Sequence, residues 1–424
     1  MLDLKAIRDD PDSYRAAMAR RGAAEDLEEL ITLDAKRREL TVRVEDLRAE
    51  QNRASKQIGA AKGDEKQRLI EEVSVVSAGL KELEPELEAA AEGIEALLAR
   101  LPNVADTSAP DGETDEDNFE VKKVGRPPLF EFPVRDHVEL GQILGTIDIE
   151  RAAKASGSRF AYLLGPIVLW QFALVRYALD ILIAKGFTPA IPPVLVREEA
   201  LYGTGFLPTG GEQIYAMRDD DLYLVGTSEV SLAAYHMDEI LDADRLPLRY
   251  TGYSTCFRRE AGTYGKDTRG MFRVHQFDKV EMFSFAKPED SSAEHDFLVS
   301  IEEEIVGGLD LPYRTVNVCT GELGSSAAKK IDIEVWLPGQ QQYRELTSCS
   351  NCTDYQARRL GTRYRRDGGN APVHTLNGTA TAVGRTLIAL LENNQRRDGS
   401  VRAPEALRAY LPEAAWGLAP QTGV

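Results

Sequence analysis

The sequence predicts an α+β protein in which an N-terminal antiparallel coiled-coil hairpin precedes a domain built on an antiparallel sheet. Two observations carry this prediction. The first is a long heptad pattern of apolar residues that is confined to the first hundred residues. The second is that the strand-like runs after residue 120 do not alternate regularly with helical segments. That order argues against a parallel doubly wound sheet and favours an antiparallel sheet with flanking helices.

The composition is that of an ordinary globular protein. Hydrophobic residues make up 43% and charged residues 28%, and the formal net charge of −18 argues against nonspecific nucleic-acid binding without excluding a local basic face. Four cysteines, with no secretory h-region behind MLDLKAIRDD, indicate a reducing, cytoplasmic location. The longest apolar run, PIVLWQFALVRYALDILIA, is interrupted by Gln171, Arg176 and Asp180, so we expect a buried helix and no membrane partner.

Residues 1–101 are predicted to form a helical domain whose long arm covers about 27–101. Apolar or small residues recur in steps of three and four along 40–61 and, after the turn signal KGDE, along 69–101. Two antiparallel helices follow, and Pro85 is expected to kink or break the second. The first arm, 34–68, holds ten basic and seven acidic residues, whereas 69–100 holds two and eight. A solvated coiled coil or a polyanion-binding face would each explain this asymmetry.

A linker is predicted at 102–120, because LPNVADTSAPDGETDEDN is rich in Pro, Asp, Ser and Thr. A mixed domain follows over 121–424. Its helices are expected near 137–155, 166–186 and 291–308, and its strands at 221–226, 249–257, 271–286, 313–319, 331–337 and 373–379.

The stretch CFRREAGTYGKDTRGMFRVHQFDKVEMF, residues 256–283, predicts two charged strands joined by a loop around 263–267. With side chains alternating between faces, Arg258 and Glu260 share one face of the first strand. The residues that share a face of the second strand are Arg273, His275, Phe277 and Lys279. Arginine forks beside an aromatic ring suit a phosphate and a purine, although a solvated, salt-bridged hairpin has the same pattern.

Three further segments carry candidate chemistry. GTSEVSLAAYH, 226–236, places Glu229 where a strand passes into a helix, which alone is only a capping signal. RELTSCSNCTDYQARRL, 344–360, contains Glu345 and Ser348, oxygen donors suited to a magnesium-bound nucleotide. NGTATAVGRTLIALLENNQ, 377–395, delivers Arg385 at the start of an apolar helix, and its glycines 378 and 384 would permit close approach of a ligand or another backbone.

Taken together, FRRE…FRVHQF, TSE at 227–229, ELTSCSNC and NGTATAVGRTLIALLENNQ resemble the bacterial-type seryl-tRNA synthetases. The heptad hairpin falls where that family has its tRNA-binding arm, so the resemblance covers essentially the whole chain. It implies a dimeric class II aminoacyl-tRNA synthetase with an antiparallel-sheet catalytic domain. Such an enzyme uses ATP and Mg²⁺ to activate L-serine and passes the seryl group to the 3′-terminal adenosine of tRNA(Ser) and of tRNA(Sec).

The resemblance also implies roles for individual residues. The catalytic set is Arg258, Glu260, Arg273 and Arg385. The ATP-binding set is Arg258, Arg259, Glu260, Val274, Phe277, Glu345, Leu346, Thr347, Ser348 and Arg385, with Phe277 and Arg385 on the two sides of adenine. The serine-binding set is Thr227, Ser228, Glu229, Glu281 and Thr379, and the magnesium ligands are Glu345 and Ser348. The tRNA-binding set is Arg37, Arg38, Arg43, Arg48, Arg53 and Lys56.

Two alternatives stay open at the level of the sequence. One is an amino-acid:carrier-protein ligase, although such relatives lack the arm; the other is a catalytically silent binding protein on the same fold. The CxxC at 349–352 has no second pair of ligands, so we expect no structural zinc. Ser231 stands where many members of the family have proline, which is expected to shift the serine-pocket loop slightly.

Overall fold

The computed structural model describes residues 1–262 and 269–421, so the loop predicted at 263–267 lies outside the described residues. The chain forms two compact units, Met1–Pro102 and Asn103–Val424.

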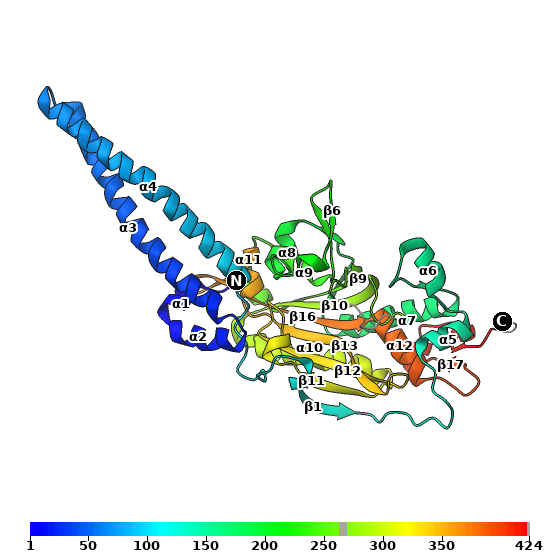
Figure 1. Ribbon diagram of the computed structural model, residues 1–424. Helices are drawn as coiled ribbons and strands as arrows, with labels where there is room; N and C mark the ends of the chain where they lie inside the picture. Colours follow the sequence, from blue (N-terminus) through cyan, green and yellow to red (C-terminus); the bar gives the residue numbers. More distant parts are fainter. Residues whose placement is uncertain (263–268, 422–424) are drawn as a thin grey trace. The chain divides into compact units, whose positions relative to one another are not determined.

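The first unit is a helical hairpin with two short helices at its base (Figure 1). Its helices are α1 (Leu4–Asp9), α2 (Pro11–Arg20), α3 (Ala24–Ala60) and α4 (Asp64–Arg100). The long helices α3 and α4 pair along their length through a seam of buried heptad residues. The buried members of this seam are Leu40, Val44, Val76, Leu80 and Leu83. The predicted antiparallel coiled-coil hairpin is therefore confirmed.

Pro85 does not break the return helix, because α4 is continuous from Asp64 to Arg100. The expected break is wrong. A proline removes one backbone donor, but cross-hairpin contacts hold both sides of this position. Arg48 Nη2 lies 2.7 Å from Glu84 Oε1, and Lys36 Nζ lies 3.3 Å from Glu86 Oε2. The seam and these ion pairs fix the helix where its own hydrogen bond is missing.

A buried carboxylate ties α1 to α3 at the base of the hairpin. The Asp34 side chain is only 2% exposed, and both of its oxygens accept hydrogen bonds from Arg8, at 2.6 and 2.7 Å. Arg37 Nη2 and Arg38 Nε add contacts at 3.4 and 3.2 Å. Burial alone would raise the pKa of Asp34, but these guanidinium groups lower it below its ordinary value. Arg37 and Arg38, two of the predicted tRNA-binding residues, thus form ion pairs with a carboxylate of the protein itself.

The second unit is built on an eight-stranded sheet in the order β1-β11-β12-β13-β16-β10-β9-β4 (Figure 1). Every neighbouring pair is antiparallel except β4 with β9. The strands are β1 (Phe119–Val124), β4 (Thr188–Ala190), β9 (Leu248–Phe257), β10 (Gln276–Ala286), β11 (Tyr313–Asn317), β12 (Lys329–Leu337), β13 (Gln342–Asn351) and β16 (His374–Ala382). This sheet and its helices confirm the predicted fold class.

Three helices supply the main core against the sheet: α7 (Pro166–Ala184), α10 (Ser291–Gly308) and α12 (Val383–Asn393). Strand alternation directs Val280, Met282 and Ala286 of β10 into this core. Among the described residues, α7 alone is long and apolar enough to cross a membrane by length and composition. In this fold it carries the fully buried Trp170, whose indole N–H donates to Ala415 O at 2.8 Å.

The remaining elements surround the sheet. The helices are α5 (His137–Leu144), α6 (Ile149–Ser156), α8 (Glu198–Thr204), α9 (Glu229–Ala233), α11 (Tyr355–Leu360) and α13 (Glu405–Arg408). Short strands form small sheets: β2 (Ile147–Asp148) with β3 (Tyr162–Leu163), β5 (Leu195–Val196) with β7 (Leu222–Leu224) and β6 (Tyr215–Met217), β8 (Ile240–Leu241) with β14 (Arg363–Arg366) and β15 (Gly369–Pro372), and β17 (Val401–Arg402) with β18 (Gly417–Leu418). The single helix expected at 137–155 is divided by β2, after Gly145 ends α5 at a φ of +63°.

The segment expected to be a linker is packed onto the second unit. Asn103 N–H donates to Ser325 O and Asp106 N–H donates to Ala328 O, both at 2.8 Å. Ala105 and Ala109 are buried in a small apolar cluster, and Phe119 already belongs to β1 of the sheet. The polar composition of this stretch reflects turns that are hydrogen-bonded to the domain rather than a free connection.

Candidate active site

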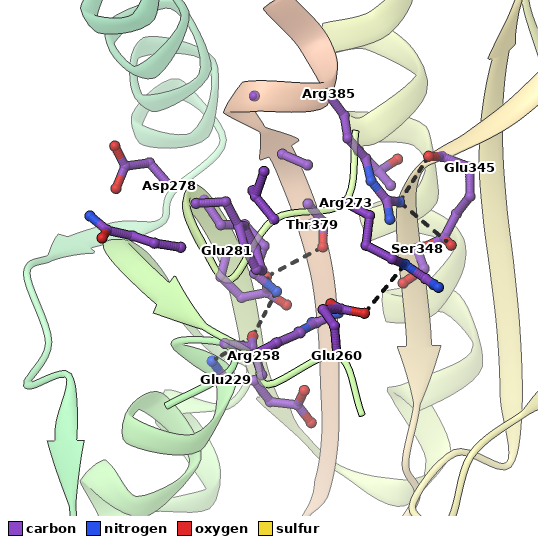
Figure 2. Close-up of a pocket in the computed structure, with 18 of the residues that line it drawn as sticks. Glu229, Arg258, Glu260, Arg273, Asp278, Glu281, Glu345, Ser348, Thr379 and Arg385 are labelled. Atoms are coloured by element: carbon purple, nitrogen blue, oxygen red, sulfur yellow. Dashed lines mark hydrogen bonds and ion pairs between the residues drawn. The ribbon is translucent and has the colours of Figure 1, made fainter. Parts of the chain in front are cut away.

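A cavity of about 990 Å³ opens on the face of the sheet that is opposite Val280 and Met282. Strands β10, β13 and β16, the start of β12, the loop between β9 and β10, and the start of α12 all contribute to its lining. Figure 2 shows that carboxylates and arginines from these separate segments converge there, while Asp278 of β10 points away from Glu281. The odd-numbered charged residues of β10 face this cavity, which explains why charge alternates with core residues in that strand.

One end of the cavity holds a buried ammonium–carboxylate pair. Lys279 Nζ lies 2.5 Å from Glu281 Oε2 and donates a hydrogen bond to Thr227 Oγ1 at 2.6 Å. Thr379 Oγ1 donates to the same Glu281 oxygen at 3.4 Å. Ala380 is an extra residue in the ladder between β10 and β16, and this bulge brings Thr379 opposite Glu281.

Glu229 lies beside this pair at the first residue of α9 and is almost fully buried. Its Oε1 accepts hydrogen bonds from Gln356 Nε2 at 2.8 Å and from Asn377 Nδ2 at 3.0 Å. Burial, followed by the neighbouring charge of Glu281, raises the pKa of Glu229 to about 7. An amino acid's ammonium group would find here a carboxylate whose charge is poorly satisfied by the protein.

The charged residues after β9 lie in a loop, not on a strand. Strand β9 ends at Phe257 and β10 begins only at Gln276, so the expected pairing of faces for Arg258 with Glu260, and for Arg273 with Phe277, is wrong. Glu260 has a φ of +50°. This left-handed turn lets its carboxylate meet Arg273 Nε at 3.3 Å (Figure 2). The alternation of faces expected from the sequence does not apply here, because these residues of the site lie between β9 and β10 and not within a regular strand.

Arg258 is held at two points. Its Nε donates to Gly226 O at 3.1 Å, and its guanidinium carbon lies 5.3 Å from the centroid of the Phe277 ring. His275 Nδ1 donates to Arg258 O at 2.9 Å, so this histidine supports the backbone of the loop. Both contacts fix the guanidinium while leaving its terminal nitrogens toward the cavity that Arg258 lines.

Glu345 and Ser348 of β13 share one face of the sheet although they are three residues apart. Leu346 is an extra residue in the ladder with β12, so Glu345 lies opposite Glu334 and Ser348 opposite Asp332. Burial would raise the pKa of Glu345, but the charges of Arg385, Lys330 and Arg258 lower it. An ionised carboxylate beside a hydroxyl on one face is a donor pair suited to a hard divalent cation.

Arg385 of α12 lies over this pair. Its Nη1 donates to Glu345 O at 2.9 Å and lies 3.6 Å from Glu345 Oε2 (Figure 2). Its guanidinium carbon is 4.7 Å from the centroid of the Phe272 ring. Arg385 thus lies against the ring of Phe272, whereas Arg258 lies against the ring of Phe277.

Most predicted site residues of the second unit line this one cavity. They are Thr227, Glu229, Arg258, Glu260, Arg273, Val274, Phe277, Glu281, Glu345, Leu346, Thr347, Ser348, Thr379 and Arg385. Ser228 is fully buried, and the exposed Arg259 is tied through its backbone N–H to Gln213 O; neither lines the cavity.

Sequence reasoning gave no role to Lys279, Phe272, Gln356 or Asn377, which complete the site. Lys279 was visible as one of the residues on the charged face of its strand, whereas Asn377 lies among the polar and small residues of HTLNGTATA and gave no signal. Gln356 gave no local signal, because its contact with Glu229 spans 127 residues of chain.

The CxxC cysteines are buried behind the site. Cys349 and Cys352 have 0% exposure, and burial raises the pKa of both thiols. The Sγ of Cys352 accepts a hydrogen bond from Asn377 Nδ2 at 3.6 Å. These cysteines support the strand that carries Ser348. The expected absence of a structural zinc ion is a separate point and remains a prediction.

Comparison with family models first defines the class. Residues 214–394 match the class II core domain of the tRNA synthetases for G, H, P, S and T, and this match contains the cavity residues named above from Thr227 to Arg385. Fold and site together define a class II aminoacyl-tRNA synthetase.

The N-terminal unit and the full-length relatives narrow the class. Residues 1–105 match the seryl-tRNA synthetase N-terminal domain. A serine–tRNA ligase of Streptomyces coelicolor is 52% identical over 97% of both chains, and one of Acidothermus cellulolyticus is 51% identical over 97% of this chain and 98% of its own. The solved seryl-tRNA synthetase of Pyrococcus horikoshii with ATP has a TM-score of 0.92 at 43% identity, covering 99% of this chain and 100% of that one. The chain belongs to the seryl-tRNA synthetase family, which confirms the resemblance.

Proposed function

We propose that this protein is a serine–tRNA ligase that makes seryl-adenylate from L-serine and ATP in the cavity and then transfers the seryl group to tRNA(Ser) and tRNA(Sec). The observation that carries the proposal is the convergence of a phosphate-binding arginine set and a buried acidic pocket in one cavity, in a chain of this family. The experiment that tests it is serine-dependent exchange of pyrophosphate into ATP, followed by charging of tRNA with labelled serine.

Adenylation needs positioning and charge stabilisation rather than a protein nucleophile. A serine carboxylate oxygen attacks the α-phosphorus, the bond to the bridging oxygen breaks, and pyrophosphate leaves with the electron pair. Arg258 is assigned to the α-phosphate, Arg273 to the terminal phosphates, and Arg385 to the nucleotide. Because their guanidinium groups are fixed before ATP arrives, little reorganisation is required in the transition state.

The nucleotide is proposed to bring Mg²⁺, held by Glu345 and Ser348. The ionised carboxylate and the adjacent hydroxyl fit an octahedral oxygen-bound cation. When bound, such an ion supplies additional charge neutralisation for the phosphates. Arg385 donates a hydrogen bond to Glu345 O and, by its charge, lowers the pKa of the Glu345 carboxyl.

The buried end of the cavity is assigned to L-serine. Glu229 is proposed to pair with the ammonium group, and Glu281, which Thr379 holds by a hydrogen bond, to accept a hydrogen bond from the hydroxyl. A pocket built to hydrogen-bond a hydroxyl rejects alanine, because its buried polar groups are then left without partners.

The raised pKa of Glu229 predicts how the activation of serine depends on pH. Its pKa of about 7 means that the carboxyl is protonated below pH 7 and cannot pair with an ammonium group. We therefore expect kcat/KM for serine in pyrophosphate exchange to rise with pH through 7 and to be about tenfold lower at pH 6 than at pH 8. Glu229→Gln should remove this step, and a wild-type profile that is flat between pH 6 and 8 would contradict the assignment.

The hairpin of α3 and α4 is proposed to bind tRNA, through phosphate contacts along its basic helix. Arg48 is engaged with Glu84, and Arg37 and Arg38 with Asp34. Within the described part of the chain no ion pair engages Arg43, Arg53 or Lys56. These three are the best placed of the predicted set to release counterions from RNA.

Removing these three charges should change the salt dependence of tRNA binding. For the triple variant Arg43→Gln, Arg53→Gln and Lys56→Gln, we expect the slope of log affinity against log salt to fall by about 2 to 3, with pyrophosphate exchange unchanged. Filter binding of tRNA(Ser) between low and moderate salt measures it. Lys81→Gln on the acidic return helix is the control, and an unchanged slope in the triple variant would place the RNA elsewhere.

The remaining assignments complete the proposal. The unit Met1–Pro102 is proposed to be the tRNA-binding domain, and the unit Asn103–Val424, which includes the stretch expected to be a linker, the catalytic domain. A homodimer is proposed because α7 and the segment before it expose large apolar side chains, among them Leu164, Leu169 and Phe172, the last 55% exposed. A cytoplasmic location is proposed from the relatives' function in translation.

A further inference from the structure

Lys279 is the one cation buried inside the pocket assigned to serine, among the described residues that line it. It is 6% exposed and lies between Thr227, which is 2% exposed, and Glu281, which is 1% exposed. A lysine so deeply buried is held there by its partners, since an unpaired ammonium group would be expelled or neutralised. The proposed adenylation chemistry uses no charge at this point.

The hydrogen-bond roles around Lys279 are determined by its chemistry. An ammonium group only donates, so Thr227 Oγ1 must accept from Lys279 Nζ at 2.6 Å. The same oxygen accepts from the backbone N–H of Glu229 at 3.2 Å. A hydroxyl oxygen has two lone pairs, and both are now occupied. Thr227 therefore has only its O–H left, and it can act toward a ligand only as a donor.

Glu281 is constrained in a corresponding way. Its Oε2 lies 2.5 Å from Lys279 Nζ and accepts a hydrogen bond from Thr379 Oγ1 at 3.4 Å. Within the described residues no protein hydrogen bond is made to its Oε1, which is left as an acceptor that faces the pocket. The pocket thus presents one donor, from Thr227, and one acceptor, from Glu281, both fixed by the same lysine.

We propose that Lys279 is a positioning residue that fixes Thr227 as a donor and Glu281 as an acceptor, and so sets the preference of the pocket for serine over amino acids without a hydroxyl. This inference rests on the proposed function. It also gives Thr227, a member of the serine-binding set, a specific role: as a pure donor it faces an oxygen of the substrate and leaves the ammonium group to Glu229.

The test is the variant Lys279→Met, which keeps the length and apolar stem of the side chain and removes its donors. In pyrophosphate exchange we expect KM for serine to rise at least about tenfold and the ratio of kcat/KM for serine over alanine to fall at least about tenfold. KM for ATP should change by less than about threefold, since the arginines are untouched. Lys122→Met is the matched control, because it breaks an ion pair with Glu303, at 2.8 Å, outside the cavity.

The double variant Lys279→Met with Glu281→Gln covers the case in which the single variant does not fold. Measured against Glu281→Gln alone, adding Lys279→Met should raise KM for serine by a smaller factor than it does in the wild type, because the part of its effect that acts through Glu281 is already lost and only the part through Thr227 remains. Full multiplication of the two effects, an unchanged serine-to-alanine ratio in Lys279→Met, or equal losses for serine and ATP would overturn the inference. Failure of the wild-type protein to catalyse serine-dependent exchange would instead contradict the proposed function.

Discussion

Shortening the hairpin should abolish tRNA charging while sparing serine activation. Removing residues 39–89 and closing the two helices with a short glycine turn keeps the base of the hairpin, including Asp34 with Arg8 and the buried Leu27, Leu30, Ile94 and Leu97. We expect kcat/KM for charging of tRNA(Ser) to fall at least about 100-fold, since the lost contacts are those that hold the RNA by its phosphates. Charging is followed with labelled serine on purified tRNA.

The physical reason for the separation is that the two units are compact on their own. Met1–Pro102 and Asn103–Val424 each have their own core, and every residue of the cavity belongs to the second unit. Pyrophosphate exchange should therefore stay within about threefold of the full chain and serve as the control for folding. Equal charging by the shortened and full-length proteins would refute an RNA-binding role for the hairpin.

Replacing Arg258 should cause the largest loss in the activation step. We expect Arg258→Gln to lower kcat for pyrophosphate exchange by about 100- to 1,000-fold, because it removes a fixed donor from the phosphate on which charge develops. Its anchor to Gly226 O and its position over the Phe277 ring hold the guanidinium before ATP binds. Pre-steady-state measurement of adenylate formation separates this step from product release.

Arg259 provides a matched control one residue away. It carries the same charge but is exposed, and its side chain does not line the cavity. Arg259→Gln should therefore keep kcat for exchange within about threefold of the wild type. Comparable losses in the two variants would mean that net charge near the loop, rather than the placement of Arg258, governs the reaction.

The hairpin and the long helices were predictable because their signals are local and repeated. Heptads over 27–101 predicted α3 and α4, and the helix expected at 291–308 has those bounds in α10. The strand expected at 249–257 corresponds to β9, Leu248–Phe257. Period and composition extend over many residues in each case, so a single exception such as Pro85 did not change the fold.

The site was less predictable where its geometry depends on irregular backbone. Glu345 and Ser348 lie together only because Leu346 is bulged, and Glu281 meets Thr379 only because Ala380 is bulged. No spacing rule for a regular strand places residues three apart on one face. Arg258 and Arg273 do line the cavity, but they were assigned to strands that do not include them, since β9 ends at Phe257 and β10 begins at Gln276.

Contacts distant along the chain were beyond local reasoning altogether. Lys279 reaches Thr227 across 52 residues, and Asn377 reaches Glu229 across 148. These partners determine the hydrogen-bond roles of the pocket, yet the charged face that contains Lys279 did not reveal its partner, and Asn377 produced no periodic or compositional signal. Only the packing of β10, β16 and α9 around one cavity reveals them.

Transfer of labelled serine onto total bacterial tRNA, with ATP and Mg²⁺ at low and moderate salt, tests the central claim most directly. The account predicts charging that requires ATP, that serine alone supports, and that weakens as salt rises. Serine-dependent pyrophosphate exchange without any charging would contradict it and point to a carrier other than tRNA. Absence of both reactions would contradict the proposed activation of serine as well, since the cavity would then be a binding site that catalyses neither step.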